Sequence, residues 1–512
     1  MLLILLLLTL IVIGYYFLSR AKKSYRFWKN KGVAQLNPYL FYGDTKDVMF
    51  QKMSLAEFYR DAYWKFKKMG VKYGGVYDRT RRVWVLVHPD IIKLIMIKAF
   101  PHFSAHNRKF ADTLFFNNLF HMKGENWKDM RKKLTPTFTS GKMRMMYDML
   151  LQKTVGLTDL VGDMIKSGES PEIKQLLARF TTDVIGTCGF GIECDSISDE
   201  KSEFFKNGQE IFGRIANIKI PSPIVLILAV AGLINPIRFD LSDVEDFFRK
   251  IVNETVNYRE QNKIVRKDFL HLMIQLKNNG IVTDIVSEKD LYQKTGQVEG
   301  LSMEEIAGQC MLFFAAGFET SSTTMAFALL ELTQNQDVQN KLRQEIREVL
   351  KKYDGALTYD ALQEMTYCDN VISETLRKFP PVPNITRWCT KTYRVPNTDL
   401  EIPMGTLVQI PILAVQNDPE YFPEPEKFIP DRFNSENKSK IIHPTYIPFG
   451  DGPRQCLGLR FAIMQSKAGI ASLINRYSFT LNKKTRYPPK FVSASPMLLV
   501  DGGIYLEAKE VK

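Results

Sequence analysis

One cysteine stands in a sequence context that suits chemistry rather than packing. Residues 447–458 read IPFGDGPRQCLG, and a helical pattern begins at Leu459. Gly450 and Gly452 allow the backbone to turn tightly, so Cys456 is expected at the amino terminus of the following helix. Free backbone N–H groups and the helix macrodipole stabilise a thiolate at such a position. The pattern therefore indicates that the Cys456 sulfur takes part in chemistry.

Several functions of this loop can be compared. A thiolate held on a rigid glycine-rich loop is a good axial ligand for haem iron, and Arg454 could pair with a haem propionate. A cysteine hydrolase needs a histidine partner, but His443 stands in an isolated Ile-Ile-His-Pro context. A phosphate-binding P-loop is excluded because no Gly-Lys-Ser/Thr sequence is present. The haem-ligand interpretation is favoured over a buried structural thiol.

A long helix is expected upstream of this loop. Ser302 and Glu305 have the spacing of a capping box, which opens a helix. No proline interrupts the pattern until well past Gln336. The sequence therefore predicts a helix of about 30 residues over 302–332, long enough to cross a whole domain.

The middle of this predicted helix carries an acid and a hydroxyl. Ala316 and Gly317 remove side-chain bulk, so a flat group could lie against this face. Thr320 follows Ala316 by four residues and lies on the same face, where its hydroxyl could relay a proton. Glu319 is an acid in an otherwise apolar stretch. The alternative is that Gly317 serves only helix packing and that Thr320 is a bystander.

Two further pairs have spacings that bring polar groups together. Glu374 and Arg377 stand three residues apart on a predicted helix, and Arg432 follows downstream in a Pro-Asp-Arg-Phe sequence. Trp127 and Arg131 place an indole N–H and a guanidinium one helical turn apart, which suits a carboxylate. An ordinary surface ion pair and a core tryptophan beside a solvated arginine are the alternatives.

The elements that must position these residues are mainly helical. Helical patterns dominate residues 50–375, with short Pro and Gly punctuation. Small β regions are expected in three places: 76–77 and 83–87 with 79–82 as the turn; 392–395 and 400–410 with a hairpin around Met404-Gly405; and 479–482 with 497–506. The predicted fold class is mainly α with small β-sheets.

Composition limits the class of protein. The chain has 512 residues, of which 45% are hydrophobic and 24% charged, so disorder and low complexity are excluded. Six cysteines without a C-x-x-C pair argue against a disulfide scaffold, a zinc ribbon or thioredoxin-type redox chemistry. The formal net charge is +13, but no zinc-finger spacing, basic zipper region or RNA-binding motif is present. Nucleic acid is therefore not an expected partner.

The amino terminus resembles a membrane anchor. Residues 1–18 form an apolar run without a charge, about long enough to span a bilayer, and basic residues follow. We expect a transmembrane signal anchor over 1–19 and a basic linker over 20–32, with the remaining chain on the cytosolic side. A cleaved signal peptide is disfavoured because nothing basic precedes the run. The apolar segment 224–234 is too short to span; it forms either a buried helix or a segment that dips into the membrane face.

Taken together, these motifs resemble those of a cytochrome P450, a microsomal haem-thiolate monooxygenase. The resemblance covers residues 33–508 and follows the family order W-x-x-x-R, A-G-x-E-T, E-x-x-R, a P-E-R-F-like stretch and F-x-x-G-x-R-x-C-x-G. The sequences of residues 315–322 and 449–458 are similar to those of insect family-six detoxifying members. The resemblance implies a single large catalytic domain over 33–512 with the cytochrome P450 fold, tethered by the amino-terminal helix.

The resemblance implies roles for matching positions. Cys456 would be the proximal ligand of the iron in haem b, and Glu319 with Thr320 would be the acid–alcohol pair that delivers protons during oxygen activation. The residues implied to hold the haem are Trp127, Arg131, Arg387, Phe449 and Arg454. Those implied to face the substrate are Leu312, Ala315, Ala316, Val382 and Ile385, with Phe110, Phe115 and Phe116 as weaker candidates. Glu374, Arg377 and Arg432 would be structural.

Two departures from the family pattern leave questions open. The proline-rich hinge usual after the anchor is thin, with only Pro38 near, and Asp431 replaces the usual Glu of the P-E-R-F-like stretch. His106 and Arg108 both stand where a further propionate partner is expected, and the sequence does not choose between them.

The implied reaction inserts one oxygen atom from O2 into a hydrophobic small molecule. Electrons would come from NADPH through NADPH–cytochrome P450 reductase, with cytochrome b5 as a further possible partner, at the endoplasmic reticulum membrane. Substrates could be insecticides, plant toxins, hormones or lipids. The alternatives are a haem-thiolate isomerase or synthase that needs no reductase, and a non-catalytic sequestering binder.

Overall fold

The computed structural model describes residues 22–106, 112–216, 240–282 and 300–511, together with Val12, Tyr15 and Ser19. The predicted anchor over 1–19 and the segment 224–234 therefore lie largely or wholly outside the described residues. None of the helices in the described ranges combines the length and the apolar character needed to cross a membrane.

Helices make up most of the molecule, as predicted. The longer ones are α4 (Leu55–Lys68), α6 (Gly124–Leu134), α7 (Ser140–Ser167), α8 (Ile173–Ile185), α9 (Glu203–Ala216), α11 (Ser242–Gln261), α12 (Phe269–Asn279), α14 (Met303–Gln334), α15 (Gln336–Lys352), α16 (Tyr359–Glu364), α17 (Thr366–Lys378) and α19 (Leu459–Arg476). Four-residue or five-residue helices are α2 (Phe27–Asn30), α3 (Lys46–Met49), α5 (Pro89–Lys93) and α18 (Ile412–Val415). Short 3₁₀ or π turns include η1 (Leu94–Lys98), η3 (Leu114–Phe116), η5 (Gly186–Phe190), η6 (Pro430–Phe433) and η8 (Gly452–Arg454).

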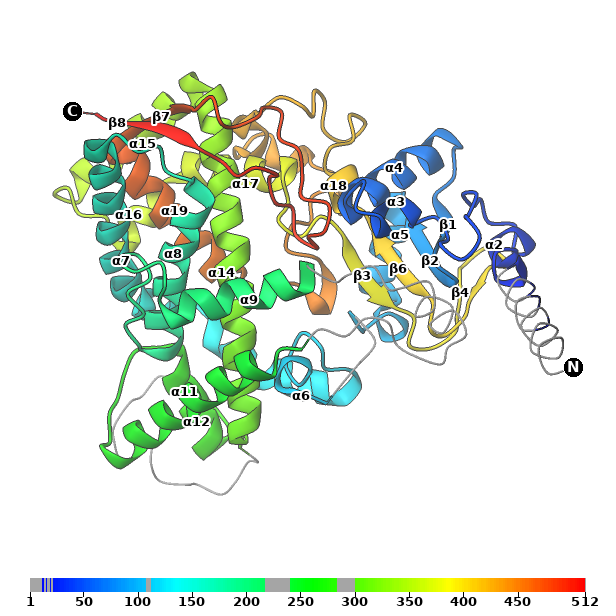
Figure 1. Cartoon of the computed structure of the whole chain (residues 1–512), viewed down its shortest axis with the longest axis horizontal. Coiled ribbons are helices and arrows are strands. Elements are labelled where there is room, and N and C mark those ends of the chain that lie inside the picture. The colour runs from blue at the N-terminus through cyan, green and yellow to red at the C-terminus, as the bar shows by residue number, and fades with distance from the viewer. Residues whose placement is uncertain are drawn as a thin grey trace, which may run out of the picture.

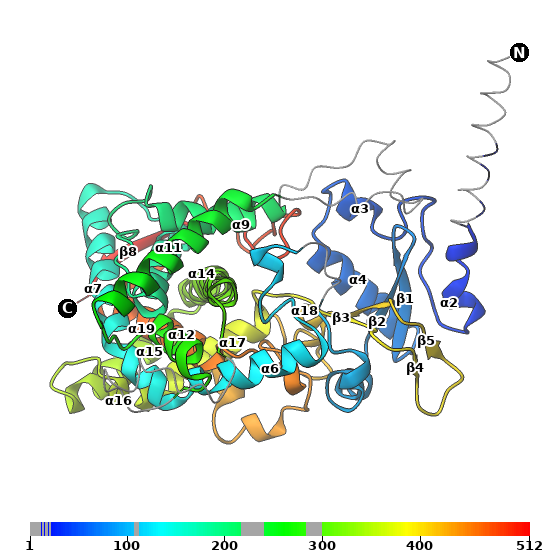
Figure 2. The same ribbon diagram turned by 90° about the horizontal axis from the view of Figure 1, so that it is seen from below.

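Helix α14 is the axis of the helical part. Its 32 residues begin at the predicted capping box, in which the Glu305 N–H donates to the Ser302 hydroxyl and the Ser302 N–H donates to the Glu305 carboxylate. Viewed along its length, α14 is surrounded by α9, α11, α12, α17 and α19 (Figure 2). Most of its side chains are buried. A helix that is covered on nearly all sides can present chemical groups to the interior without loop mobility.

The strands form one four-stranded sheet and two small ribbons. The larger sheet has the order β1 (Tyr73–Asp78), β2 (Arg81–Leu86), β6 (Leu407–Ile410), β3 (Ile385–Trp388). It lies beside α4 and α5 at the end of the molecule opposite to α7 and α15 (Figure 1). The ribbons pair β4 (Tyr393–Arg394) with β5 (Glu401–Ile402) and β7 (Tyr477–Leu481) with β8 (Leu506–Glu510).

Three details of the predicted strands are wrong. The turn between β1 and β2 is only two residues long, because Arg81 and Arg82 already pair with Asp78 and Tyr77. Residues 400–410 do not form one hairpin. Strand β6 lies between β2 and β3, and all four of its residues are buried. Strand β5 pairs with β4 instead, and its Glu401 is exposed.

The last predicted strand is displaced toward the carboxyl terminus. Residues 497–505 lie outside the named strands, and the partner of β7 is β8 instead. Leu498 uses its N–H to bond the carbonyl of Pro381 at 2.9 Å, which draws this segment over the end of α17. A tertiary contact therefore replaces the local pairing that the sequence suggested.

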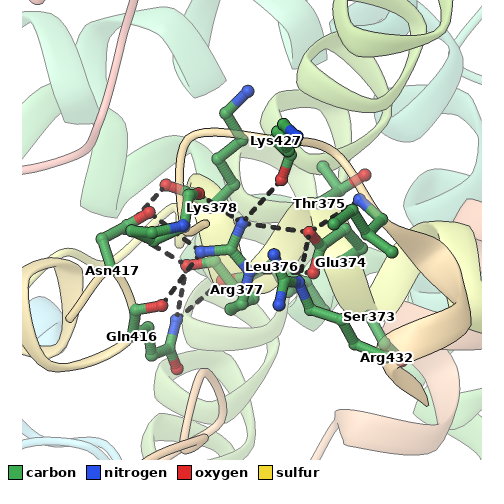
Figure 3. Close-up of polar contacts among 12 residues, drawn as sticks. Ser373, Glu374, Thr375, Leu376, Arg377, Lys378, Gln416, Asn417, Lys427 and Arg432 are labelled. Atoms are coloured by element: carbon green, nitrogen blue, oxygen red, sulfur yellow. Dashed lines mark hydrogen bonds and ion pairs between the residues drawn. The ribbon is translucent and has the colours of Figure 1, made fainter. Parts of the chain in front are cut away.

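The Glu374, Arg377 and Arg432 side chains meet in a buried cluster (Figure 3). The Arg377 guanidinium donates to both Glu374 oxygens at 2.8 and 3.0 Å, and both side chains are fully buried. Arg432 donates to the same carboxylate at 3.3 Å. Arg377 also donates to the carbonyls of Gln416 and Pro425, so one side chain ties α17 to two distant loops. The surface-pair alternative is therefore wrong.

Asp431 takes no part in this cluster, although it stands beside Arg432. Its carboxylate pairs with Lys341 at 3.1 Å, and both of these side chains are exposed. The substitution of Asp for the usual Glu at this position therefore changes a surface contact only.

Removal of the Glu374 charge is expected to destabilise the fold strongly. Glu374→Gln leaves two guanidiniums without their carboxylate in a buried site, so the free energy of unfolding should fall by about 3–5 kcal/mol. Chemical denaturation followed by circular dichroism measures this loss. Asp431→Asn is the matched control, because breaking an exposed pair costs about 1 kcal/mol or less. Equal losses in the two variants would contradict the buried role of the cluster.

Candidate active site

A cavity of about 350 Å³ lies between the middle of α14 and the loop that precedes α19. Nearly every residue predicted to touch a cofactor or substrate contributes to its wall. Cys456, Phe449 and Arg454 come from the loop, Trp127 and Arg131 from α6, and Arg387 from β3. The opposite wall contains Leu312, Ala316, Gly317 and Thr320 of α14, with Val382 and Ile385 from the segment after α17.

The loop that carries Cys456 is closed by a backbone hydrogen bond and by two turns. The Cys456 N–H donates to the Phe449 carbonyl at 2.9 Å. Gly450 and Gly452 have φ angles of 74° and 68°, a region that favours glycine. At Gly452 a Cβ atom would stand 2.3 Å from the carbonyl oxygen of Met96, so a larger residue cannot fit. Glycine is required here by a close backbone approach as well as by the turn.

The Cys456 thiol faces the cavity at the amino terminus of α19, as predicted. Of the six cysteines it is the exposed one, and the other five are buried. Its exposure is to the cavity, because the surrounding protein still raises the pKa of the thiol by burial. The Gly458 N–H and the Arg131 guanidinium oppose this effect and lower the pKa. Two effects therefore oppose each other at this thiol. The neighbouring N–H and guanidinium favour the thiolate, whereas burial disfavours it.

Three guanidiniums gather around the cavity without a carboxylate. None of Arg131, Arg387 and Arg454 forms an ion pair with a described acidic residue, and the Nε atoms of Arg387 and Arg454 have no hydrogen-bond partner. Burial lowers the pKa of Arg387 to about 10 and that of Arg454 to about 9. Buried positive charge of this kind is costly unless an anion neutralises it.

Local contacts hold these arginines in place. Arg454 donates to the carbonyls of Leu119 and Met122 and lies 4.3 Å above the centre of the Trp127 ring. Arg131 donates to the carbonyl of Gln455 at 2.9 Å. Trp127 and Arg131 lie on one helix and both line the cavity, as predicted, but the indole lies under Arg454.

His106 is the residue that lies beside Arg387. Arg387 Nη1 stands 3.0 Å from His106 Nδ1, and because arginine has no acceptor the imidazole accepts this bond. Burial lowers the pKa of His106 well below its usual range, so the ring is neutral. Its ring stacks on Phe120 with centroids 4.4 Å apart. Arg108, the other candidate, lies outside the described residues.

In the oxygen-facing turn of α14, which comprises residues 315–320, the predicted side chains point in two directions. Thr320 lines the cavity and its hydroxyl donates to the Ala316 carbonyl at 2.7 Å. Glu319 is buried but does not line the cavity, and its carboxylate pairs with Lys174 of α8 at 2.9 Å. Ala315 is also buried outside the lining. Gly317 both lines the cavity and packs closely, since a Cβ there would stand 2.4 Å from Ile185 Cδ1.

The aromatic residues that line the cavity differ from those predicted to face the substrate. Phe115 and Phe116 contact each other and His121 and do not line the cavity, and Phe110 lies outside the described residues. The sequence did not suggest four aromatic residues that line the cavity, which are Phe120, Phe138, Phe269 and Phe313. These come from separate helices and a loop, and no local spacing marks them as members of one site.

The residues around the cavity fit a haem group. No cluster of three or more His, Cys, Asp or Glu side chains that could hold a metal occurs among the described residues. A single thiol can bind a metal ion stably when a macrocycle supplies the other ligands, as in haem-thiolate proteins. The unneutralised guanidiniums of Arg131, Arg387 and Arg454 suit propionates, and the apolar walls suit a flat porphyrin.

Selective labelling of the haem-free protein is expected at Cys456. It should react with iodoacetamide faster than the five buried thiols, with a rate that rises into the alkaline range because burial raises its pKa. Arg131→Gln should move this pH profile to still higher pH, since Arg131 lowers the pKa.

Peptide mass spectrometry of the labelled protein measures the site and the rate. Arg460→Gln is the matched control, because Arg460 donates to the Phe138 carbonyl and is not among the groups that act on the thiol. Labelling spread equally over several cysteines would show that the sulfur does not face an open cavity.

Comparison with known proteins agrees with this geometry. The chain is 40% identical over 503 residues to probable cytochrome P450 6a14 and 38% identical over 499 residues to cytochrome P450 6a2, both from Drosophila melanogaster. In each case the match covers 96% of this chain and 96% of the relative. It is also 37% identical over 506 residues to cytochrome P450 6k1 of Blattella germanica, which covers 97% of this chain and 95% of the relative.

The family model described as cytochrome P450 matches residues 47–506. The mainly α fold with small sheets, the haem cofactor and the supply of electrons from NADPH through a reductase follow from this membership, and they agree with the expectations from the sequence. With these relatives across nearly its whole length and a thiol-lined cavity at its centre, the chain belongs to the cytochrome P450 family of haem-dependent monooxygenases.

Proposed function

We propose that this monooxygenase oxidises hydrophobic small molecules such as insecticides and plant toxins. The observation that carries the proposal is the cavity itself, in which apolar side chains of α14 and of the segment after α17 stand opposite Cys456. Leu312, Ala316, Val382 and Ile385 offer an apolar substrate contact surface, and Ala316 keeps it open near the reacting centre. The insect relatives are named as cytochrome P450 enzymes, which supports the class of reaction.

The protein side chains hold the cofactor in this proposal. When bound, haem supplies the iron at which dioxygen is activated, so that one oxygen atom enters the substrate and the other becomes water. Cys456 provides the sulfur ligand, and its negative charge is favoured by the Gly458 N–H and by Arg131. Arg131, Arg387 and Arg454, with Trp127 and Phe449 beside them, bind the propionate side and the ring. Neutral His106 orients Arg387.

Thr320 and Glu319 control protons in this proposal. The Thr320 Oγ1 atom reaches the cavity, while the Glu319 carboxylate lies on the α8 side of the same turn. Lys174 is partly exposed, so the ion pair connects the buried turn with solvent. The Thr320 hydroxyl holds a proton at the cavity surface, and the Glu319–Lys174 pair stands between this turn and the solvent that supplies protons.

We further propose an endoplasmic reticulum location with the catalytic domain on the cytosolic side. The support is the sequence of residues 1–32, an apolar run followed by a basic stretch. NADPH–cytochrome P450 reductase, and cytochrome b5 as a second donor, would reach the protein there.

Turnover assays test the function directly. The full chain with reductase, NADPH and a panel of apolar compounds should consume NADPH and form products heavier by one oxygen atom, as measured by mass spectrometry. Omission of the reductase or of NADPH should abolish the products. Product formation without NADPH would favour an isomerase or synthase, and binding of compounds without NADPH consumption would favour a sequestering protein.

Replacement of Thr320 is expected to divert the reaction. Thr320→Val keeps the shape but removes the hydroxyl, so proton delivery fails and consumed NADPH ends as hydrogen peroxide. Product formed per NADPH should fall about 10²-fold, the lower end of the contribution of one positioned acid–base group. Thr333→Val is the matched control, because Thr333 donates to the Leu330 carbonyl in the same helix but outside the cavity lining. An unchanged ratio of product to peroxide in Thr320→Val would refute the role of the hydroxyl.

A further inference from the structure

Helix α8 contacts three consecutive residues of the oxygen-facing turn of α14. Ile185 packs against Gly317, the Thr181 hydroxyl donates to the Phe318 carbonyl at 3.0 Å, and Lys174 pairs with Glu319 at 2.9 Å. Residues 174, 181 and 185 lie at i, i+7 and i+11, which is one face of a helix. The two helices also share more close approaches than any other pair of elements in the described structure. This face of α8 therefore covers the turn beside the cavity: Ile185 reaches the cavity wall together with Gly317, while Thr181 and Lys174 lie outside the lining.

The Thr181 bond is the one polar contact among these three that reaches the α14 backbone. Its side chain is fully buried, and the hydroxyl lies between the carbonyls of Phe318 and Ala178. The Phe318 carbonyl also accepts from the Ser322 hydroxyl at 2.8 Å. Hydroxyl bonds to a helix carbonyl compete with the backbone N–H and bend the helix locally. The carbonyl of Phe318 is thus held by groups other than its own helical partner.

Two further hydroxyl bonds to helix carbonyls lie at the same turn. Thr320 donates to the Ala316 carbonyl, and Thr324 donates to the Thr320 carbonyl at 2.8 Å. These bonds are made within α14, whereas the Thr181 bond fixes the turn against a separate helix. The Thr181 bond to the Phe318 carbonyl is therefore made two residues before Thr320, within the turn whose backbone sets where Thr320 begins.

We propose that Thr181 is a positioning residue for oxygen activation. Its hydroxyl pins the Phe318 carbonyl, which sets the backbone of residues 316–320 and directs Thr320 Oγ1 toward the cavity. This inference rests on the proposed role of Thr320 in proton delivery. Thr181 does not line the cavity and does not touch a reacting group, so it acts through α14 alone.

The adjacent residue provides a matched control. Thr182 is also fully buried, and its hydroxyl donates only to the Ala178 carbonyl within α8, at 2.8 Å. Thr181→Val and Thr182→Val thus remove the same group from neighbouring buried positions, but only the first removes a bond to α14. Thr181→Ser keeps the donor and should restore the wild-type behaviour.

Hydrogen exchange of the folded holoprotein tests the contact without reference to turnover. Peptides that cover residues 316–322 should exchange about fivefold faster in Thr181→Val, the effect of losing one buried hydrogen bond, and remain at the wild-type rate in Thr182→Val. Haem content and the thermal midpoint of each variant report any general loss of structure. Equal exchange in the two valine variants would overturn the proposal.

The division of NADPH between product and hydrogen peroxide gives the functional readout. Thr181→Val should increase the peroxide share severalfold, while Thr182→Val and Thr181→Ser stay near wild type. If Thr320→Val changes this division but Thr181→Val does not, the positioning role is overturned while the proposed function stands. If Thr320→Val leaves the division of NADPH unchanged, the proposed role of Thr320 in proton delivery is refuted. The exchange experiment then still decides whether Thr181 holds the turn.

Discussion

The centre of this protein contains more buried positive charge than its own acids neutralise. Arg131, Arg387 and Arg454 surround one cavity and form no ion pair with a described carboxylate. Burial lowers the pKa of each, which shows that the fold holds these charges against their preference for water. Such an arrangement is stable when an anionic group occupies the cavity. The propionates of haem and the thiolate of Cys456 would supply that negative charge.

The rest of the fold supplies rigidity to this cavity. Glu374 and Arg377 fix the end of α17 to loops that lead toward Cys456, and glycine at position 452 allows the cysteine loop to press against the backbone of Met96. On the other side, the long helix α14 runs through the helical part of the molecule (Figure 1). Its small residues Ala316 and Gly317 line the cavity. The chemistry therefore lies between a loop that cannot easily relax and a helix that is covered by its neighbours.

Features contained within one element could be predicted from the sequence. The capping box of α14, the position of Cys456 before α19 and the pairing of Glu374 with Arg377 each depend on spacing over a few residues. Strand partners could not be predicted, because the choice of β2 and β3 as neighbours of β6 depends on burial in the folded sheet. The direction of the Glu319 carboxylate follows from its ion pair with Lys174 of α8, which no local pattern encodes. Likewise His106 and Phe120 reach the cavity from loops whose course is set by tertiary packing.

The central claim is that the Cys456 sulfur binds the haem iron as a thiolate. The carbon monoxide difference spectrum of the reduced, purified protein measures this most directly, because a thiolate opposite carbon monoxide shifts the main absorption band strongly to the red. The account predicts this shifted band in the wild-type protein and its loss in Cys456→Ser. A wild-type protein without haem absorbance, or a serine variant with the same shifted band, would contradict it.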